Sequence, residues 1–480
     1  MIMLDFDIER FVRKYMTKRP ESLLAADFAK YSDRMHAAID GRKMLVIGGA
    51  GTIGSNYVKA ALRQFRPAAM YVVDIDENQL TELTRELRSG SEYTVPETYV
   101  TEPIDLGSRL FEKFFKAHGP FDIVANFAAR KHVRAERDIH SIEAMCETNV
   151  FMAKKLLDLL LENPPAAFFC VSTDKAANPV NVMGATKKLM EETIMAYAAA
   201  SQPHTPKEKG KGKNEKGECE EKEKGIVKSE KGECEKGGER KGFKIVTARF
   251  ANVAFSNGSL PIGWLNRIAK HQPLSCPLGI RRFFVSPIES GELCLAASVL
   301  AESGDIVYPK LDETRDMIPF DVVVKDMLND MGLGCHECSS TAEAMEAMKE
   351  INDHASSPSS HEPSSFSPST PHEPSSLFPF PFSFPKGYPV EFFGSDTDGE
   401  KTFEEFYTNE DEKDETTFVN LGVVKNAKRR PVEEVEAIFA NLHAVFDRPG
   451  STKDDVVEAL REYLPNFHHI SKGKSLDGRM

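Results

Sequence analysis

Residues 172–187, with the sequence STDKAANPVNVMGATK, carry side chains suited to moving protons. Asp174 and Lys175 are neighbours, so burial would weaken the charge of the lysine and the carboxylate would restore it. The ammonium is then finely balanced between its two protonation states. A strand that ends at Ser172 would let the following loop turn both side chains toward one substrate. We therefore expect an acid–base site at Thr173, Asp174 and Lys175; an exposed polar loop is the alternative.

A second candidate site lies in residues 46–62, VIGGAGTIGSNYVKAAL. Its glycines follow an apolar run in G-x-G-x-x-G spacing and precede a helical pattern. Glycine lets the backbone approach a pyrophosphate, and a helix that begins near Ile53 offers free amide hydrogens and a positive dipole end. A glycine turn without nucleotide is the alternative. The pattern predicts a dinucleotide site that includes Gly48, Gly51, Thr52, Ile53 and Gly54.

Acidic and small residues follow the next three apolar runs. Asp74 is placed to accept hydrogen bonds from an adenosine ribose. Together with Asp76 it would repel a 2′-phosphate, so NAD is expected rather than NADP. Asp105 and Leu106 are expected beside the adenine, and Ala128 beside the nicotinamide.

Short β-rich runs alternate with amphipathic helical patterns through the first half of the chain. This alternation predicts an α/β fold: a doubly wound parallel sheet of the Rossmann type, with helices on both faces. Beyond about residue 255 the elements become shorter and mixed, which indicates a smaller region at the carboxyl edge of the sheet. The predicted strands are KMLVIGG, AAMYVVDID, ETYVTEPID, FDIVANFAA, AAFFCVSTD and FKIVTARFANV, and the helices include ENQLTELTRELRS, SRLFEKFFKAH and HSIEAMCETNVFMAKKLLDLLLEN.

Two segments have the composition of disordered insertions. Residues 207–241 are nearly all Lys, Glu and Gly and have little apolar surface to bury, and prolines deny residues 354–386 regular structure. The predicted organisation is a helical N-terminal extension at 1–41, a Rossmann NAD-binding domain at 42–255, a substrate-binding region at 256–428 and C-terminal helices at 429–480.

Composition limits the function classes. The net charge of -13 argues against binding to nucleic acid. No run approaches the roughly 18 apolar residues of a membrane helix, so we expect no membrane span and a cytoplasmic location. Cys146, Cys170 and Cys294 lie in apolar runs and are expected to be reduced. Cys335 and Cys338 form an isolated Cys-x-x-Cys pair, for which we expect a loop rather than a metal site.

Six segments together resemble the extended short-chain dehydrogenase/reductases, and among them the nucleotide-sugar 4,6-dehydratases of polysaccharide biosynthesis. The Thr-Asp-Lys trio is similar to the UDP-N-acetylglucosamine 4,6-dehydratase branch, which includes the CapD-like proteins. Met183 stands where many members carry a tyrosine. The resemblance covers most of the chain outside the two insertions. The segments are GGAGTIGS, FAARKHVRAERD, STDKAANPVNVMGATK, RFANVAFSNGS, RRFFVSPIES and GEKTFEEFYT.

The resemblance implies that bound NAD oxidises C4 of the sugar, that water leaves from C5 and C6, and that the hydride returns to C6. We assign Lys175 as the base for the C5 proton and Asp174 as the acid for the C6 oxygen, with Thr173 positioning the pair or binding the C4 oxygen. Since no tyrosine is present, Asp174 is also assigned the proton of the C4 hydroxyl. Lys187 is expected to hold the nicotinamide ribose, and Met183 to fill space beside the substrate.

The resemblance places three further residues at the substrate. Lys131 and Asn252 would face it, and Arg282 would meet the diphosphate, whose oxygens match a planar guanidinium. Spacing alone leaves each of them open as a surface charge or, for Asn252, a turn residue. The segment GEKTFEEFYT also matches the family, but its Glu400, Lys401 and Glu404 are equally consistent with a solvated helix face.

Two other functions stay open at this point. An epimerase of the same fold is one, although a simple C4 epimerase depends on the missing tyrosine. A non-catalytic NAD-binding regulatory protein is the other, although Asp174, Lys175 and Lys187 are all retained. The expected partners are a UDP-sugar and a second copy of the chain, since proteins of this fold often dimerise through the helices found here at 138–163 and 183–201.

Overall fold

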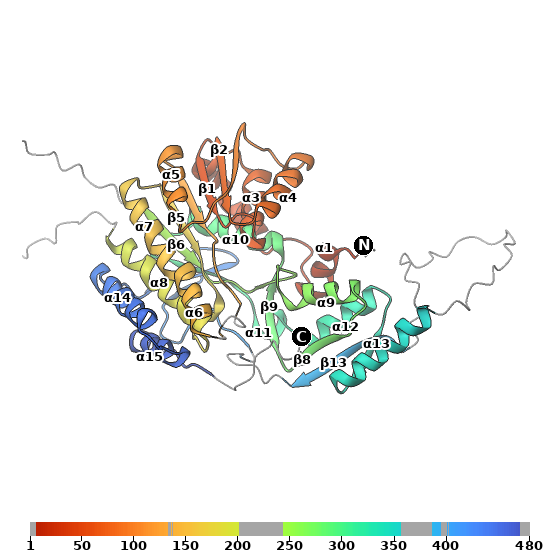
Figure 1. Ribbon diagram of the computed structural model, residues 1–480. Coiled ribbons are helices and arrows are strands. Elements are labelled where there is room, and N and C mark those ends of the chain that lie inside the picture. Colours follow the sequence, from red (N-terminus) through yellow and green to blue (C-terminus); the bar gives the residue numbers. More distant parts are fainter. Residues whose placement is uncertain are drawn as a thin grey trace, which may run out of the picture.

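The computed structural model describes residues 6–132, 136, 138–200, 243–356, 386–394, 401 and 403–470. The insertion predicted at 207–241 lies outside these residues, as do residues 357–385 of the insertion predicted at 354–386. Figure 1 shows a central sheet between helices, with a smaller group of elements beside it.

Six parallel strands make up the first part of the sheet, and each lies within a predicted run. They are β1 (Lys43–Ile47), β2 (Ala69–Asp74), β3 (Thr98–Pro103), β4 (Ile123–Asn126), β5 (Ala167–Val171) and β6 (Lys244–Ala248). β1 pairs with both β2 and β4, so the chain winds outward from the centre in two directions. Every residue of β5 is buried, as expected for a parallel strand covered on both faces. The predicted fold class is confirmed.

Three further strands extend this sheet past β6. They are β10 (Ile306–Pro309), β14 (Lys413–Asp414) and β15 (Leu421–Val424), which complete the order β14-β15-β10-β6-β5-β4-β1-β2-β3. β10 runs parallel to β6, whereas β15 runs antiparallel to β10. Because β10 and β15 bury all their residues, the main core continues through them. The sheet therefore does not end at the boundary predicted near residue 255.

Helices lie against this sheet and against one another. α3 (Thr52–Gln64) packs closely on α10 (Pro287–Leu300), and α8 (Val182–Ala200) packs on β6. Gly291 permits the first contact, because a Cβ there would lie 2.2 Å from the carbonyl oxygen of Asn56. The other helices of this part are α4 (Glu77–Ser89), α5 (Arg109–His118), α6 (Ile139–Cys146) and α7 (Met152–Glu162), with a π-helical turn at Glu147–Phe151.

The smaller group of elements contains two three-stranded sheets and a second apolar core. One sheet has the order β11-β9-β7, from β7 (Asn252–Val253), β9 (Arg281–Val285) and β11 (Met317–Pro319). The other has the order β12-β13-β8, from β8 (Leu274–Leu278), β12 (Cys335–Cys338) and β13 (Tyr388–Gly394). The Cys-x-x-Cys pair, expected in a loop, thus forms an edge strand. The helices are α9 (Leu260–Ala269), α11 (Glu313–Asp316), α12 (Phe320–Asp330) and α13 (Thr341–Ser356).

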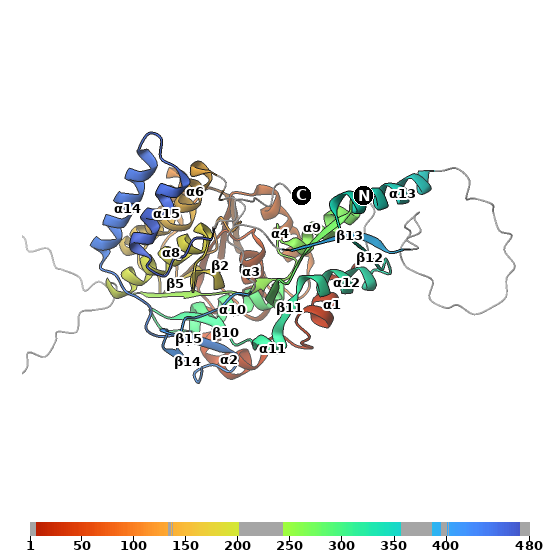
Figure 2. The ribbon, with the colours of Figure 1, turned by 90° about the horizontal axis from the view of Figure 1, so that it is seen from below.

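The N-terminal segment is helical, as predicted, and contributes to both cores. It contains α1 (Ile8–Phe11), a π-helical turn (Val12–Met16) and α2 (Ala25–Ile39). Phe11 is buried in the smaller core, and Met35 in the main core. In Figure 2, α1 lies beside α12, which the following π-helical turn contacts, while α2 packs on α10. The segment therefore connects the two parts of the chain.

The C-terminal helices α14 (Val432–Asp447) and α15 (Lys453–Tyr463) cover the helix layer of the main sheet. α14 packs on α8 and α15 on α6, side by side in both views (Figures 1 and 2). The ring of Phe151 stacks on His443 with centroids 4.1 Å apart. Nearly all of α8 is buried. Within this chain, α14 thus covers part of α8, and the expected self-association stays a prediction.

Two expectations concern the described residues as a whole. The six cysteines within them are all free thiols, as predicted for Cys146, Cys170 and Cys294. Among the helices of the described ranges, none combines the length and apolar character needed to span a membrane.

Candidate functional site

The glycine-rich loop after β1 needs its glycines for steric reasons. Gly48 has a φ of +69°, and a Cβ on it would lie 2.5 Å from the backbone nitrogen of Ala128, at the end of β4. A Cβ on Gly54 would lie 2.3 Å from the carbonyl oxygen of Gly48. Gly51 precedes the first turn of α3, where Thr52 and Ile53 are half-buried. The loop therefore passes close to the amino end of a helix, the arrangement that binds a pyrophosphate.

The other predicted cofactor residues lie at the carboxyl ends of neighbouring strands. Asp74 ends β2 and accepts hydrogen bonds from the backbone nitrogens of Ala50 (2.9 Å) and Asp76 (3.1 Å). Its carboxylate thus also orders the glycine-rich loop. Asp105 is exposed after β3, followed by the buried Leu106. Together with Ala128, which is half-buried after β4, these residues fit a dinucleotide laid across the strand ends.

Thr173, Asp174 and Lys175 form one hydrogen-bonded unit after β5. Thr173 caps a short 3₁₀ turn, Asp174–Ala176. Oδ1 of Asp174 accepts hydrogen bonds from Oγ1 of Thr173 (2.7 Å) and from the backbone nitrogen (2.9 Å) and Nζ (3.0 Å) of Lys175. Asp174 is 4% exposed. The unit therefore pairs a buried carboxylate with a half-buried lysine and a hydroxyl, and is not an exposed polar loop.

The charge balance of this unit favours a protonated lysine. Burial lowers the pKa of Lys175, but the carboxylates of Asp174 and Glu404 outweigh burial, and the pKa is raised. Lys175 therefore carries a proton at rest and must give it away before it acts as a base.

Glu404 is the residue of this site that sequence reasoning missed. Its Oε1 lies 3.9 Å from Nζ of Lys175 and 4.0 Å from Nη2 of Arg282, and its side chain is 4% exposed. The described residues 403–408 form no helix, so the interpretation as a solvated helix face is wrong for Glu404. Burial raises the pKa of Glu404, and the charge of Asp174 adds to this against the opposing cations. The motif GEKTFEEFYT was the one sequence feature that could have pointed to Glu404. The spacing of its residues does not indicate that the Glu404 side chain is buried.

Met183 and Lys187 lie on the first turns of α8. Met183 is 3% exposed, and its backbone nitrogen donates to Oε1 of Glu136 (2.9 Å). The position where a tyrosine was expected therefore holds a buried, non-titrating side chain. Nζ of Lys187 donates to the carbonyl oxygen of Val171 (2.9 Å), at the end of β5. Burial lowers the pKa of Lys187.

The structure brings one of the three other substrate residues to the trio. Arg282, on β9, is buried and donates from Nη1 to the carbonyl oxygens of Arg281 (2.9 Å) and Lys401 (3.0 Å). Its guanidinium thus holds the segment that carries Glu404. Asn252 is half-buried on the neighbouring strand β7, and Lys131 is exposed after β4.

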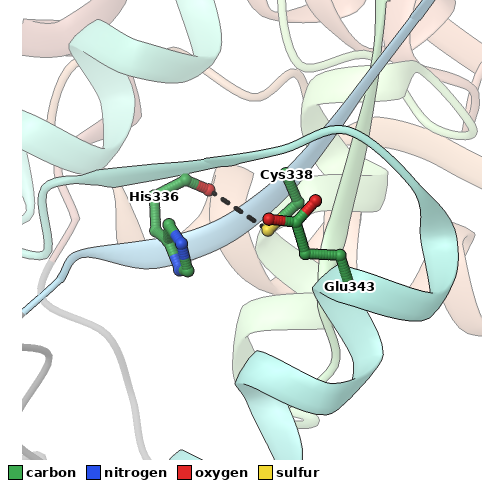
Figure 3. Close-up of side chains that lie close together, drawn as sticks. All are labelled: His336, Cys338 and Glu343. Atoms are coloured by element: carbon green, nitrogen blue, oxygen red, sulfur yellow. Dashed lines mark hydrogen bonds between the residues drawn. The ribbon is translucent and has the colours of Figure 1, made fainter.

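Histidine, cysteine and glutamate side chains converge at a second place, shown in Figure 3. His336 and Cys338 lie on β12, and Glu343 on the first turn of α13. The carboxylate of Glu343 accepts hydrogen bonds from the backbone nitrogen and hydroxyl of Ser339, both at 2.7 Å. Burial raises the pKa of the Cys338 thiol, which disfavours the thiolate that a metal binds. The local turn thus accounts for Glu343, and we assign no role to the cluster.

Comparison with known proteins identifies the family of this chain. The sequence model of a family described as "Polysaccharide biosynthesis protein" matches residues 44–209 and 221–344. An uncharacterised membrane protein of Methanocaldococcus jannaschii is 30% identical over 288 residues, 60% of this chain and 72% of the relative. A UDP-N-acetylglucosamine 4,6-dehydratase (inverting) of Campylobacter jejuni is 28% identical over 158 residues, 33% of this chain and 44% of the relative.

Among solved structures, Pen from Bacillus thuringiensis aligns with a TM-score of 0.55 and 17% identity. The alignment covers 84% of this chain and 98% of Pen, a likeness in fold. With the family match over more than half of its length, the chain belongs to the polysaccharide biosynthesis protein family of extended short-chain dehydrogenase/reductases.

Proposed function

We propose that this chain is an NAD-dependent nucleotide-sugar 4,6-dehydratase that converts UDP-N-acetylglucosamine to its 4-keto-6-deoxy product for polysaccharide or glycan biosynthesis. The observation that carries the proposal is the partly buried contact of 3.0 Å between Nζ of Lys175 and Oδ1 of Asp174, after the end of β5. The similarity to the Campylobacter jejuni dehydratase supports it, over the 33% of this chain that the alignment covers.

In this proposal Gly48, Gly51 and Gly54 and the first amides of α3 hold the pyrophosphate of NAD. Asp74 holds the adenosine ribose, and Lys187 supplies positive charge at the nicotinamide end. NAD, when bound there, would supply the hydride acceptor for C4 of the sugar and the hydride donor for C6, with no net change of the cofactor in each turnover.

Asp174 and Lys175 supply the proton transfers of the elimination. Passing the proton of Lys175 to Asp174 leaves a neutral amine beside a carboxylic acid. The amine then removes the proton from C5, and the acid protonates the departing C6 hydroxyl, so that water leaves. Both groups return to their starting charges, because one proton enters the pair and one leaves it. Thr173 positions Asp174 through its 2.7 Å hydrogen bond.

Four residues line the substrate side in this proposal. Lys131 and Asn252 contact the sugar nucleotide, and Met183 contributes an apolar surface. Arg282 contributes positive charge near the diphosphate; its Nη1 is already engaged with backbone carbonyls. We also keep a cytoplasmic location and self-association as predictions.

The test is incubation of the purified chain with UDP-N-acetylglucosamine and NAD, followed by mass spectrometry and NMR. Loss of one water and a 4-keto-6-deoxy product are expected. An unchanged mass with an inverted C4 or C5 centre would replace the proposal with an epimerase. No change with any UDP-sugar would favour a non-catalytic NAD-binding protein.

A further inference from the structure

Because Met183 stands where many family members carry a tyrosine, the proposed reaction lacks an evident acceptor for one proton. When C4 is oxidised, the proton of its hydroxyl must pass to a base. Met183 does not titrate, and Nζ of Lys187 is buried and donates to a carbonyl oxygen. The remaining candidates to accept this proton are the carboxylates of the site.

Asp174 is poorly suited to that task. Its Oδ1 already accepts three hydrogen bonds, from the hydroxyl of Thr173 and from two nitrogens of Lys175. Asp174 is also needed to protonate the C6 oxygen.

Glu404 differs from Asp174 in its hydrogen bonding. Its side chain is 4% exposed, yet no hydrogen bond to its carboxylate is present among the described residues. Its nearest cationic atoms lie 3.9 and 4.0 Å away, beyond hydrogen-bond distance. A buried carboxylate without a hydrogen-bond donor is costly unless a ligand supplies one. A neutral sugar hydroxyl would do so, whereas a diphosphate would be repelled.

We propose that Glu404 is a catalytic residue whose carboxylate contacts the sugar and accepts the proton of the C4 hydroxyl. This inference rests on the proposed function and replaces the assignment of that proton to Asp174. The O–H bond of the hydroxyl breaks and its proton passes to Glu404, while the C–H electron pair leaves C4 as the hydride assigned above to the nicotinamide cofactor. When the hydride returns to C6, Lys175 gives a proton to C5 and takes the proton held by Glu404, so that both groups regain their starting charges. Lys175, 3.9 Å away, then holds the negative charge of the C4 oxygen as it develops.

Glu404 lies beyond residues 44–209 and 221–344, the part of the chain that the family model matches. The contact between Glu404 and Lys175 therefore involves a residue outside the region that the family model matches. It depends on Arg282, whose hydrogen bond to the carbonyl oxygen of Lys401 holds the segment against β9.

The experiment compares Glu404→Gln with Glu410→Gln, which removes the same charge from an exposed position of the same segment. Glu404→Gln should lower the dehydration rate by at least about 100-fold. Glu410→Gln should stay within about twofold of the parent chain. UDP affinity, measured by calorimetry, should not fall in either variant, because the Glu404 carboxylate beside Arg282 would oppose rather than support diphosphate binding.

The pH profile provides a readout that a structural role would not move. The rate of the parent chain should fall on the acid side with a midpoint above the ordinary glutamate range, and Glu404→Gln should lack this limb. Equal activity of the two variants would overturn the inference and leave the proposed function intact. A loss of UDP affinity in Glu404→Gln would also overturn it, in favour of substrate positioning. An inactive parent chain would instead defeat the proposed function. If Glu404→Gln does not fold, the acid limb of the parent chain and of Glu404→Asp decides.

Discussion

Glu191 and Arg249 form a buried ion pair with two contacts beneath the candidate acid–base segment. Oε2 of Glu191 lies 2.8 Å from Nη2 of Arg249, Oε1 lies 3.0 Å from Nε, and both side chains are 1% exposed. The same Oε1 accepts a hydrogen bond from Ser172 (2.6 Å), the residue before the trio. The pair thus ties α8 and the end of β6 to the start of the segment that carries Asp174.

Breaking this pair should destabilise the fold. Glu191→Ala leaves Arg249 buried without its partner, so we expect a loss of about 3–5 kcal/mol in the free energy of unfolding. Urea denaturation measures it. The control is Glu458→Ala, which removes an exposed partner of Arg461 and should cost at most about 1 kcal/mol. Similar losses of unfolding free energy in the two variants would show that the buried pair stabilises the fold no more than the exposed pair does.

The contribution of Glu191 should also depend on pH. Burial raises its pKa, but Arg249 lowers it by more, so the folded-state pKa lies below the ordinary value of 4.5. A group of this kind stabilises the fold above the unfolded-state pKa and loses that effect as pH falls through the folded-state pKa. The stability difference between the parent chain and Glu191→Gln should therefore be full at pH 7 and shrink in acid. A constant difference across this range would contradict the pairing.

Removing the amine of Lys175 should stop the reaction without releasing the cofactor. Lys175→Ala deletes the proposed C5 base, so product formation should fall by about 100-fold to 10,000-fold. NAD affinity should be unchanged, because the glycine-rich loop lies on other strands. Lys349→Ala, an exposed change on α13, is the control. A Lys175→Ala enzyme that still makes product would show that the assigned mechanism is wrong.

A methyl group at Gly54 should disrupt the dinucleotide loop. Its Cβ would lie 2.3 Å from the carbonyl oxygen of Gly48 and 2.8 Å from Cα of Gly49, so backbone must move. We expect Gly54→Ala to lose NAD binding, as measured by calorimetry. Gly263→Ala, within α9 where a Cβ meets nothing within 4 Å, should keep NAD binding and gain up to about 1 kcal/mol of stability. Retained NAD affinity in Gly54→Ala would count against the loop as the pyrophosphate site.

The cover of α8 by α14 predicts a change in assembly. Leu442 is fully buried on α14, and Leu442→Ala should cost about 2–5 kcal/mol. If the C-terminal helices stand in place of a second copy, loosening them should expose α8 and promote self-association at high concentration. Light scattering measures the mass; Glu433→Gln, a polar change on the first turn of α14, is the control. A parent chain that already associates through α8 would contradict this view.

Local patterns in the sequence account for much of the fold. The segment ENQLTELTRELRS forms α4 over the same residues, Glu77–Ser89, because its leucines recur on one helical face and Asp76 caps its amino end. The six strand runs likewise form β1 to β6. The glycine spacing after β1 indicated a turn that only glycine can make, and the Thr-Asp-Lys trio indicated chemistry at a strand end. Each of these signals lies within one short stretch of chain.

Only the tertiary structure decided what the distant segments do. Glu404 lies some 230 positions after Lys175, and no periodicity in GEKTFEEFYT distinguishes a buried carboxylate from a solvated one. The contacts of Arg282 bring it into the site. In the same way, α14 shows an ordinary amphipathic pattern that does not indicate which surface it covers, and the structure packs it on α8. Hydrophobic burial and ion pairing act between whatever surfaces the fold brings together. The sequence therefore determined the elements and predicted an acid–base role for the trio, whereas the packing determined which carboxylate lies beside it.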